Sequence, residues 1–440
     1  MTLATDGRHA LPAWPLAATV GLYPLWWGLG VADVIWIAMG AVMALYLGRA
    51  GRVEVPRGFG LWLVFIVWMT LSASQLDTLG RFVGFGYRAM HYYAATALFI
   101  YVYNARAQLT ERVVAGILTV FWGVTTVGGF LGMMMQEAVV RTPLSYVLPG
   151  ALVNNELVNH MVVRRFAQYN PDGWVQIDPR PSAPFLYTNN WGNAYSFLLP
   201  FVFLYLWHVR RERRFWWIAA MVPVSLIPAQ ATSNRGMFLA LGVIAIYLGL
   251  RYLLLGNPRI LVIVVGLGAI AAVSVTQLDL TEDIESRTSG SDTTEDRLTI
   301  YRQTLVSVQE SPTFGMGAPR PSADPSIPPV GTHGQFWIVI HSHGVPAVVA
   351  FMGWFLIAYA RSLRRRDHGG IIAGAVLVAG MLEAFYYGFL PVGLHLLMVA
   401  AAVAMAGPVD AAPPRHSGTG AHGTVETVPA RGPRTPARLL

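Results

Sequence analysis

The segment 232–236 places an arginine where an anion could bind. It reads Thr-Ser-Asn-Arg-Gly and opens a long apolar run, so Arg235 is predicted to lie at the start of a helix. A helix N-terminus attracts anions through its free N–H groups and its dipole, and a guanidinium grips phosphate oxygens as a bidentate fork. Arg235 could therefore help to bind an anion, although an arginine that simply reaches lipid headgroups would have the same sequence context.

Two further arginines lie in a long polar segment. Residues 297–305 read Arg-Leu-Thr-Ile-Tyr-Arg-Gln-Thr-Leu, and apolar side chains at positions 298, 301, 305 and 308 recur with helical spacing. Arg297 is predicted to open this helix. Arg302 lies five residues on, about 140° around a helix with 3.6 residues per turn. The two arginines are therefore rivals for one anion rather than partners.

Histidines and one glutamate complete the set of candidate groups. Gly331-Thr332-His333-Gly334 precedes an apolar run, and a histidine near the membrane can accept a hydroxyl proton because its ordinary pKa is near neutrality. His333 is thus a candidate general base, unless it is incidental. His341 and His343 are two residues apart, about 200° around a helix, which does not favour a metal site. Glu383 lies near the end of another apolar run, where it could line an acceptor groove or make a structural hydrogen bond.

Composition excludes several chemistries. All 31 basic residues are arginines, and the chain has no lysine and no cysteine. A Walker A loop and a Schiff base need lysine, and thiolate catalysis and cysteine-ligated zinc need cysteine. No Asp-x-Asp motif occurs, so no metal and no cofactor are expected. The net charge of +8 could suggest nucleic acid, but the arginines lie mostly in short turns, where membrane topology explains them and no nucleic-acid partner is expected.

The elements that position these residues are predicted to be transmembrane helices. Hydrophobic residues make up 54% of the chain and charged residues 12%, whereas soluble domains carry about 25% charged residues. We therefore expect an all-α integral membrane protein with about twelve transmembrane helices, each run being near the ~20 residues needed to cross a bilayer. The runs begin near residues 12, 31, 59, 87, 113, 191, 215, 236, 259, 336, 370 and 388.

Arginine placement predicts the orientation. Alternate short turns near residues 49–57, 106–112, 210–214, 251–259 and 361–366 are rich in arginine, and the turns between them are poor in it, apart from Arg81 and Arg88. By the positive-inside rule both termini are cytoplasmic in a multi-pass protein of the plasma (inner) membrane. The first run is expected to be an anchor, not a cleaved signal. Residues 1–406 then form the membrane domain, with long extracytoplasmic loops at 136–190 and 276–335, and residues 407–440 a disordered cytoplasmic tail.

The order of these motifs resembles the O-antigen ligase and O-antigen polymerase superfamily. Ser233-Asn234-Arg235-Gly236 is similar to its Ser-Arg-Gly turn, Arg297 matches its loop arginine, and Pro312 to Gly317 is similar to its Pro-x-x-Gly-x-Gly segment. His333 occupies the place of its His-Asn pair. The stretch 187–193, Tyr-Thr-Asn-Asn-Trp-Gly-Asn, is similar to an asparagine-rich stretch of that family. Two positions depart from the pattern: Gly334 stands where the family has asparagine, and Ser342, between His341 and His343, where it usually has an acid.

The resemblance implies a GT-C-like membrane glycosyltransferase. Members of the superfamily move a glycan from undecaprenyl diphosphate to an acceptor hydroxyl on the outer membrane face. For this chain the resemblance implies a transfer that needs no metal and inverts the anomeric centre. The implied partners are an undecaprenyl-diphosphate-linked donor, a glycan or glycolipid acceptor and the surrounding membrane lipids. The candidate catalytic residues are His333, Arg235 and Arg297, and the candidate substrate-binding residues are Arg302, Asn193, His341 and Glu383.

Two other functions remain open at this point. A polymerase would extend a second lipid-linked glycan instead of joining the glycan to a different molecule, and the number of spans favours a ligase only slightly. A transporter or flippase of lipid-linked sugars is the alternative of another class. It would predict ionisable groups near the bilayer midplane and duplicated halves, whereas the polar motifs of this chain lie in the loops.

Overall fold

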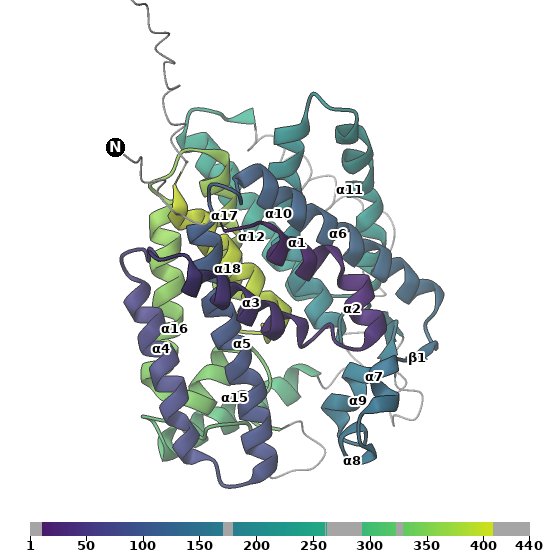
Figure 1. Ribbon diagram of the computed structural model, residues 1–440, viewed down its shortest axis with the longest axis vertical. Helices are drawn as coiled ribbons and strands as arrows, with labels where there is room; N and C mark the ends of the chain where they lie inside the picture. The colour runs from purple at the N-terminus through teal and green to yellow at the C-terminus, as the bar shows by residue number, and fades with distance from the viewer. Residues whose placement is uncertain (1–10, 170–178, 260, 262–292, 323–328, 408–440) are drawn as a thin grey trace, which may run out of the picture. The chain divides into compact units, whose positions relative to one another are not determined.

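The computed structural model describes residues 11–169, 179–259, 261, 293–322 and 329–407. Residues up to Pro408 form one compact unit (Figure 1). Several predictions fall outside the described residues: the apolar run beginning near 259, the acidic start of the second loop, the side chain of Arg297, and the tail from residue 408.

The described chain is mainly helical. Each predicted apolar run that lies within it falls on helix. The first run is two helices instead of one, since Pro24 has no N–H to continue the ladder from the preceding turn. The longer helices are α1 (Trp14–Gly21), α2 (Tyr23–Leu29), α3 (Ile35–Arg49), α4 (Phe59–Leu71), α5 (Leu79–Asn104), α6 (Glu111–Met134), α10 (Thr188–Val209), α11 (Arg214–Ala231), α12 (Arg235–Leu254), α15 (Thr293–Glu310), α16 (Gln335–Ser362), α17 (His368–Glu383) and α18 (Val392–Ala406).

Helix length and composition agree with an all-α membrane protein. Among the described residues, α6, α12 and α16 are long and apolar enough to cross a membrane, and α3, α17, α18 and α4 with the 3-10 turn η1 (Ser72–Gln75) are shorter apolar helices. The total of about twelve spans remains a prediction.

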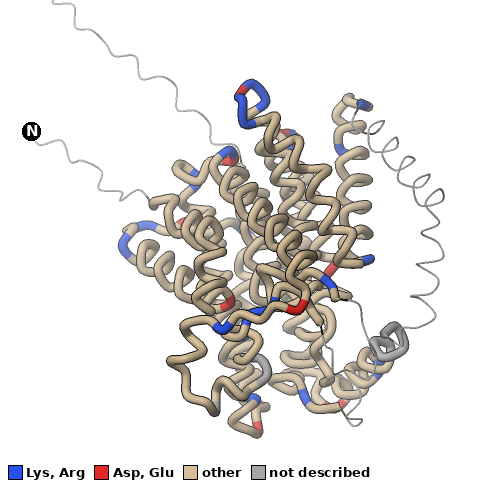
Figure 2. The backbone as a smooth tube through the Cα atoms, turned by 90° about the vertical axis from the view of Figure 1, so that its right-hand side faces the viewer, with Lys and Arg blue, Asp and Glu red and all other residues tan. Residues whose placement is uncertain are grey.

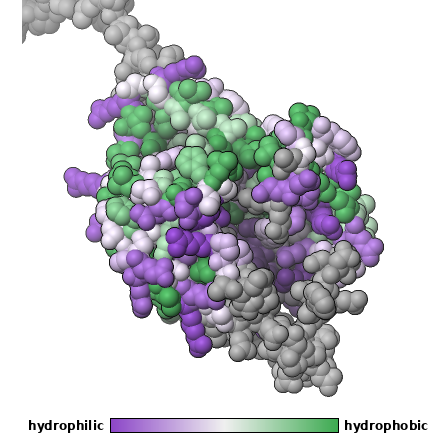
Figure 3. All heavy atoms as spheres, turned by 90° about the horizontal axis from the view of Figure 1, so that it is seen from below, coloured by the Kyte–Doolittle hydropathy of each residue, from purple (hydrophilic) through white to green (hydrophobic). Residues whose placement is uncertain are grey.

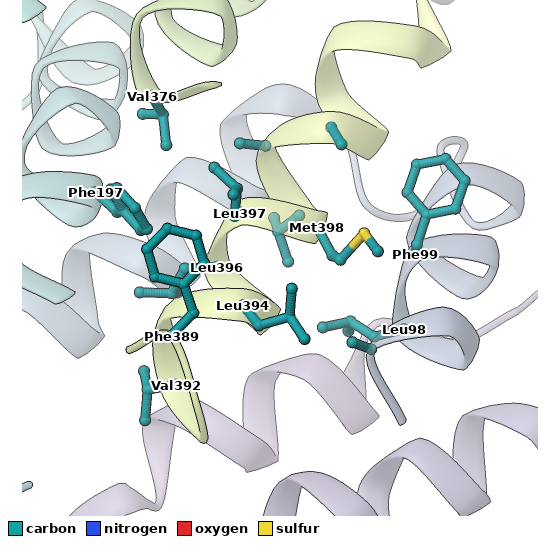
Figure 4. Close-up of a cluster of buried hydrophobic side chains, with 14 of the residues drawn as sticks. Leu98, Phe99, Phe197, Val376, Phe389, Val392, Leu394, Leu396, Leu397 and Met398 are labelled. Atoms are coloured by element: carbon teal, nitrogen blue, oxygen red, sulfur yellow. The ribbon is translucent and has the colours of Figure 1, made fainter. Parts of the chain in front are cut away.

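The helix α18 forms the centre of the core. Its sequence is apolar on every side, which is typical of a helix surrounded by protein, and residues from Val392 to Met405 are all buried. Figure 4 shows its side chains between those of α5, α10 and α17. The residues of this cluster that Figure 4 labels are Leu98, Phe99, Phe197, Val376, Phe389, Val392, Leu394, Leu396, Leu397 and Met398.

The five arginine-rich turns meet at one end of the helices, which we call the arginine-rich end. Arg106 pairs with Glu54 at 2.7 Å, and Arg112 pairs with Glu212 at 2.6 Å. Arg365 pairs with Glu111 at 2.7 Å, and the guanidinium of Arg251 donates to the Arg365 carbonyl at 2.7 Å. Figure 2 shows basic turns at the upper end of its view. The shared end is what the predicted topology requires, although which side of the membrane it faces is still a prediction.

The described parts of both long loops lie at the opposite end, the loop end, where Figure 1 places α8, α9 and α15. In its described residues the first loop carries two antiparallel strand pairs and three short helices. Arg164 and Asp33, both buried, hold this loop to the turn between α2 and α3 by a 2.7 Å ion pair that lacks hydrogen-bond geometry. Its elements are β1 (Val139–Arg141), α7 (Pro143–Val147), α8 (Gly150–Val153), α9 (Glu156–Val162), β2 (Val163–Arg165), β3 (Ala167–Gln168) and β4 (Arg180–Pro181), with β1 paired to β2 and β3 to β4.

Candidate functional site

Arg235 is the first residue of α12, as its turn predicts. Ser233 adopts a positive φ of 52°, which turns the chain sharply between α11 and α12. Asn234 is buried and donates from its side-chain amide to the carbonyl of Thr188 at 2.7 Å, so the turn is fixed to the start of α10. Arg235 is exposed, and within the described residues its guanidinium makes no hydrogen bond or ion pair. A positive group at a helix N-terminus is thus available to an anion.

The start of α12 packs against the segment Phe385–Tyr387, which follows α17. A Cβ added at Gly236 would lie 2.5 Å from the Tyr386 ring, so only glycine allows this approach. The Tyr386 hydroxyl donates to the Gly236 carbonyl at 3.0 Å. Burial, and then the nearby charge of Glu383, raise the pKa of Tyr386, which keeps this hydroxyl protonated as a donor. Segment 385–387 is therefore a direct neighbour of Arg235.

His333 is held against the same segment. Gly334 has a φ of 80°, and a Cβ there would lie 2.6 Å from the Phe385 carbonyl oxygen. The next residue, Gln335, donates its backbone N–H to the carbonyl of Tyr387 at 2.7 Å. His333 itself is half-buried, and its Nδ1 lies 2.9 Å from the Thr332 hydroxyl. Gly334 departs from the family pattern, and the close backbone approach gives a physical reason for glycine at this position.

The second-loop helix α15 contacts this site through Tyr301. Tyr301 stacks on Trp337 with ring centroids 4.5 Å apart, and both side chains donate to the Phe385 carbonyl, at 3.2 and 3.1 Å. The helix begins at Thr293, four residues earlier than expected, so the prediction that Arg297 opens it is wrong. Thr293 precedes two acids, and acids in a first turn are stabilised by the helix dipole.

The helical period distinguishes the positions of the two rival arginines. Position 297 lies four residues before Tyr301, hence on the same face of α15. Arg302 is exposed and lies one residue after Tyr301, about 100° away from that face. Position 297 therefore shares the face of α15 that carries Tyr301, and which of the two arginines acts at the site stays a prediction.

The glycine-rich segment Pro312–Gly317 is hydrogen-bonded to a break in α16. Gly344 has φ 82° and ψ −179°, which interrupts the helix. The N–H groups of Met316 and Gly317 donate to the carbonyls of His341 and Ser342 at 2.8 and 2.7 Å. The turn thereby satisfies carbonyls that a continuous helix would have used.

His341 and His343 face different surroundings. His343 is buried, and its Nδ1 lies 2.7 Å from the Ser72 hydroxyl. His341 is also buried, its ring packs on Gly331, and neither ring nitrogen makes a hydrogen bond within the described residues. Among those residues no group of three potential metal ligands comes together.

Asn193 and Glu383 form a separate, buried cluster. The Glu383 carboxylate accepts hydrogen bonds from the Asn193 amide and from the Ser196 hydroxyl, the latter at 2.7 Å. Both residues are almost fully buried, and Gly393 packs directly on the Asn193 amide. These two candidate side chains therefore contact each other, but among the described residues they make no hydrogen bond with the side chains of His333 or Arg235.

Sequence reasoning missed the aromatic segment that connects the site. Phe385, Tyr386 and Tyr387 looked like a short external turn, and only their density of aromatic residues distinguished them. Arg81 and Arg88 were noticed only as exceptions to the arginine alternation, and both belong to α5, with Arg81 reaching the glycine-rich segment.

Comparison with known protein families agrees with this arrangement. Residues 224–352 match the family model for O-antigen ligase. The match confirms the resemblance that the ordered motifs indicate. It spans α12, α15, the glycine-rich segment and the first half of α16, and it leaves out Asn193 and Glu383. A search of curated proteins found no match.

Proposed function

We propose that the protein is a membrane glycosyltransferase of the O-antigen ligase type. It transfers a glycan from an undecaprenyl-diphosphate-linked donor to an acceptor hydroxyl on the extracytoplasmic face. One observation carries the proposal: the N-terminus of α12, the start of α16 and the helix α15 all contact the segment Phe385–Tyr387. This brings Arg235, His333 and position 297 into one neighbourhood, within the range that matches the O-antigen ligase model.

In the proposed reaction the arginines bind the diphosphate of the donor. As the glycosidic bond breaks, negative charge grows on the departing diphosphate, and arginine forks stabilise such charge without a metal. Arg235 is suited to this role because it is exposed at a helix N-terminus, where the backbone dipole adds to its own charge. Arg297 would grip the same diphosphate from α15.

In the proposed reaction His333 acts on the acceptor as a general base. The Thr332 hydroxyl has one hydrogen, and it donates this hydrogen to the Pro329 carbonyl at 2.7 Å. The 2.9 Å contact between Thr332 and His333 then requires Nδ1–H of the imidazole as the donor. In that tautomer Nε2 is the basic nitrogen, and it accepts the proton of the acceptor hydroxyl as that oxygen attacks the anomeric carbon. Attack opposite the diphosphate inverts the anomeric centre.

A test should measure donor binding and transfer separately. The full chain is placed in liposomes with a lipid-linked glycan donor and an acceptor saccharide. For Arg235→Ala we expect a transfer rate lower by about a hundredfold to a thousandfold, the usual effect of losing one contact to developing negative charge. Arg235→Lys should recover little, since an ammonium cannot form the bidentate fork. Arg165→Ala, an exposed arginine at the same end, is the matched control.

The histidine variant should behave differently. His333→Ala is expected to bind undecaprenyl diphosphate as the wild type does, while its transfer slows because no base takes the hydroxyl proton. Full transfer by His333→Ala, or donor movement across the bilayer without transfer, would contradict the proposal; the latter outcome would favour a flippase.

Metal independence is a further expectation of the proposal. Because arginines supply the positive charge, transfer by the purified protein should survive excess EDTA. The matched measurement adds a divalent cation after chelation. A complete loss of activity that the cation restores would mean that a metal takes part.

A further inference from the structure

Two arginines at the loop end depart from the charge distribution of the membrane domain. The arginine-rich turns meet at one end, yet Arg81 and Arg88 lie in the half of α5 toward the other end, and Arg81 donates to the glycine-rich segment of the second loop. They are seven residues apart and so share one face of α5. Positive residues are disfavoured on the outer side of a membrane protein, so this pair calls for a local reason.

Arg81 has a structural partner set. Its guanidinium donates to Asp77 at 2.5 Å and to the carbonyls of Met316 and Ala318, the latter at 3.1 Å. The hydrogen bond from Arg81 lowers the pKa of Asp77, which keeps the carboxylate charged at neutral pH. Arg81 therefore fixes α5 to the glycine-rich segment, and Asp77 balances its charge.

Arg88 and Arg320 have no bonded partners of this kind, although Asp77 lies near enough to Arg320 for the two charges to interact. Both are half-buried, and in the part of the chain that the structure describes neither guanidinium makes a hydrogen bond or an ion pair. Arg320 is positioned by a two-residue bridge in which its backbone pairs with Val330. We call Arg81, Arg88 and Arg320, with His341 among them, the arginine cluster.

Contacts around His341 bring the three arginines together. Arg81 donates to the Met316 carbonyl, and the Met316 N–H donates to the His341 carbonyl. Arg320 pairs with Val330, the neighbour of the Gly331 that packs on the His341 ring. Arg88 lies on α5 between Phe85 and Tyr92, whose rings both contact His343.

The His341 ring is 1% exposed, and neither of its nitrogens has a hydrogen-bond partner among the described residues. Buried polar groups are normally hydrogen-bonded, and charges near a low-dielectric interior are normally paired. The one carboxylate of Asp77 interacts with both Arg81 and Arg320, and two of the three arginines, Arg88 and Arg320, have no bonded partner among the described residues. Together with the unsatisfied imidazole, they indicate an anion that would complete them.

The position of the cluster relative to His333 suggests what carries the anion. Gly331 packs on the His341 ring, whereas Gly334 packs on the Phe385 carbonyl beside Arg235. His333 therefore lies between the arginine cluster and the proposed donor site. In an inverting displacement the acceptor approaches from the side opposite the leaving group, so the cluster is on the acceptor's side. Figure 3 looks onto the loop end and shows hydrophilic residues gathered around a hollow.

We propose that Arg88 and Arg320, with His341, bind an anionic group of the acceptor saccharide, a phosphate or a carboxylate. The inference rests on the proposed transfer reaction, because only that reaction has an acceptor. Arg81 positions the cluster through its bonds to the glycine-rich segment. The acceptor is accordingly an acidic or phosphorylated glycan instead of a neutral one.

The first experiment measures binding without turnover. The full chain is placed in nanodiscs of phosphatidylcholine, and calorimetry measures the affinities for inorganic phosphate and for undecaprenyl diphosphate. The double variant Arg88→Gln with Arg320→Gln should bind phosphate at least about tenfold more weakly, since each arginine contributes charge-assisted bonds. Its affinity for undecaprenyl diphosphate should change less than twofold. Arg165→Gln, an exposed arginine of strand β2, should change neither affinity.

Several outcomes would overturn the inference. An unchanged phosphate affinity would mean that the cluster binds no anion, and equal weakening of both ligands would place the donor there. If phosphatidylglycerol in the nanodisc abolished phosphate binding, a lipid headgroup would be the occupant. The lysine pair Arg88→Lys with Arg320→Lys keeps the charges and should recover part of the affinity. This recovery separates lost binding from misfolding, which thermal unfolding of each variant also reports.

The second experiment uses turnover and links the site to the acceptor. With an acceptor prepared in phosphorylated and dephosphorylated forms, the double glutamine variant should raise KM for the phosphorylated form and leave KM for the other unchanged. Equal changes for both acceptors would overturn the assignment to the acceptor. If no acceptor of any kind were glycosylated, the proposed function would fail, while the phosphate measurement would still decide whether the cluster binds an anion.

Discussion

At the scale of single residues, Glu383 illustrates how one carboxylate fits two sequence interpretations. An ionisable group near the end of a transmembrane helix could contact substrate or could hold helices together. In the structure its two oxygens accept from Asn193 of α10 and from Ser196 one turn further on, and the carboxylate is fully buried. Gly393 leaves room for the Asn193 side chain beside α18. These contacts favour a role in joining α10 to α17.

The first prediction follows from this cluster. Glu383→Ala should lower the free energy of unfolding by roughly 2–4 kcal/mol, since two buried donors lose their acceptor. Glu383→Gln keeps the shape and one acceptor oxygen, so its loss should be smaller and its transfer rate close to that of the wild type. Thermal unfolding in detergent and the transfer assay measure the two effects. A glutamine variant that is stable but inactive would instead assign Glu383 to the substrate.

At the scale of elements, periodicity and charge predicted much of what the structure contains. The apolar runs within the described residues are helices, and α12 begins at Arg235 because the preceding turn of small polar residues ends α11. Other features depend on contacts that no local pattern encodes. The meeting of α12, α15 and α16 at Phe385–Tyr387 joins residues 150, 84 and 48 positions apart in sequence. The first predicted span is divided at Leu22 because Pro24 interrupts the hydrogen-bond ladder, and α15 starts before Arg297.

The break in α16 gives the second prediction. Gly344 has a φ and ψ that are nearly exclusive to glycine, and a Cβ there would lie 2.3 Å from the Thr313 carbonyl oxygen. Gly344→Ala should therefore destabilise the protein by about 3 kcal/mol or more and release the glycine-rich segment from α16. Gly48→Ala is the matched control: Gly48 is in α3 with open space around it, so alanine there should be neutral or stabilise by up to ~1 kcal/mol. Equal unfolding temperatures for the two variants would contradict this reasoning.

The ion pairs at the arginine-rich end give a third prediction. Arg365 bonds to Glu111 of α6 at 2.7 Å and to Asp367 at 2.8 and 2.5 Å, and it also donates to the carbonyl of Val403 in α18. It thus connects three helices while being 9% exposed. Arg365→Ala should lower the free energy of unfolding by roughly 2–4 kcal/mol. This loss is somewhat smaller than for a fully buried ion pair because both acids are partly exposed. Arg213→Ala, an exposed arginine of the same end, should have little effect on the unfolding temperature.

At the scale of the whole molecule, the arginine-rich turns and the proposed sites lie at opposite ends. The arginine-rich turns are joined to one another by ion pairs and by the bond from Arg251 to the Arg365 carbonyl, and the proposed donor and acceptor sites lie at the loop end. The positive-inside rule predicts that the first end faces the cytoplasm and hence that the proposed chemistry takes place outside. A lipid-linked donor would then reach Arg235 from the outer leaflet. The orientation of the protein is therefore the premise on which the reaction depends.

The fourth prediction tests that orientation directly. The chain has no cysteine, so a single introduced cysteine is the only thiol in the protein. Tyr146→Cys in α7 and Gln309→Cys in α15 are exposed at the loop end, and Arg213→Cys is exposed at the arginine-rich end. An impermeant maleimide added to intact cells should label the first two, and it should label the third only after the membrane is opened. Labelling of all three in opened membranes controls for accessibility. If Arg213→Cys reacted in intact cells while the loop positions did not, the proposed acceptor and donor sites would face the cytoplasm. An extracytoplasmic transfer would then be impossible, whatever the variants of Arg235 and His333 did.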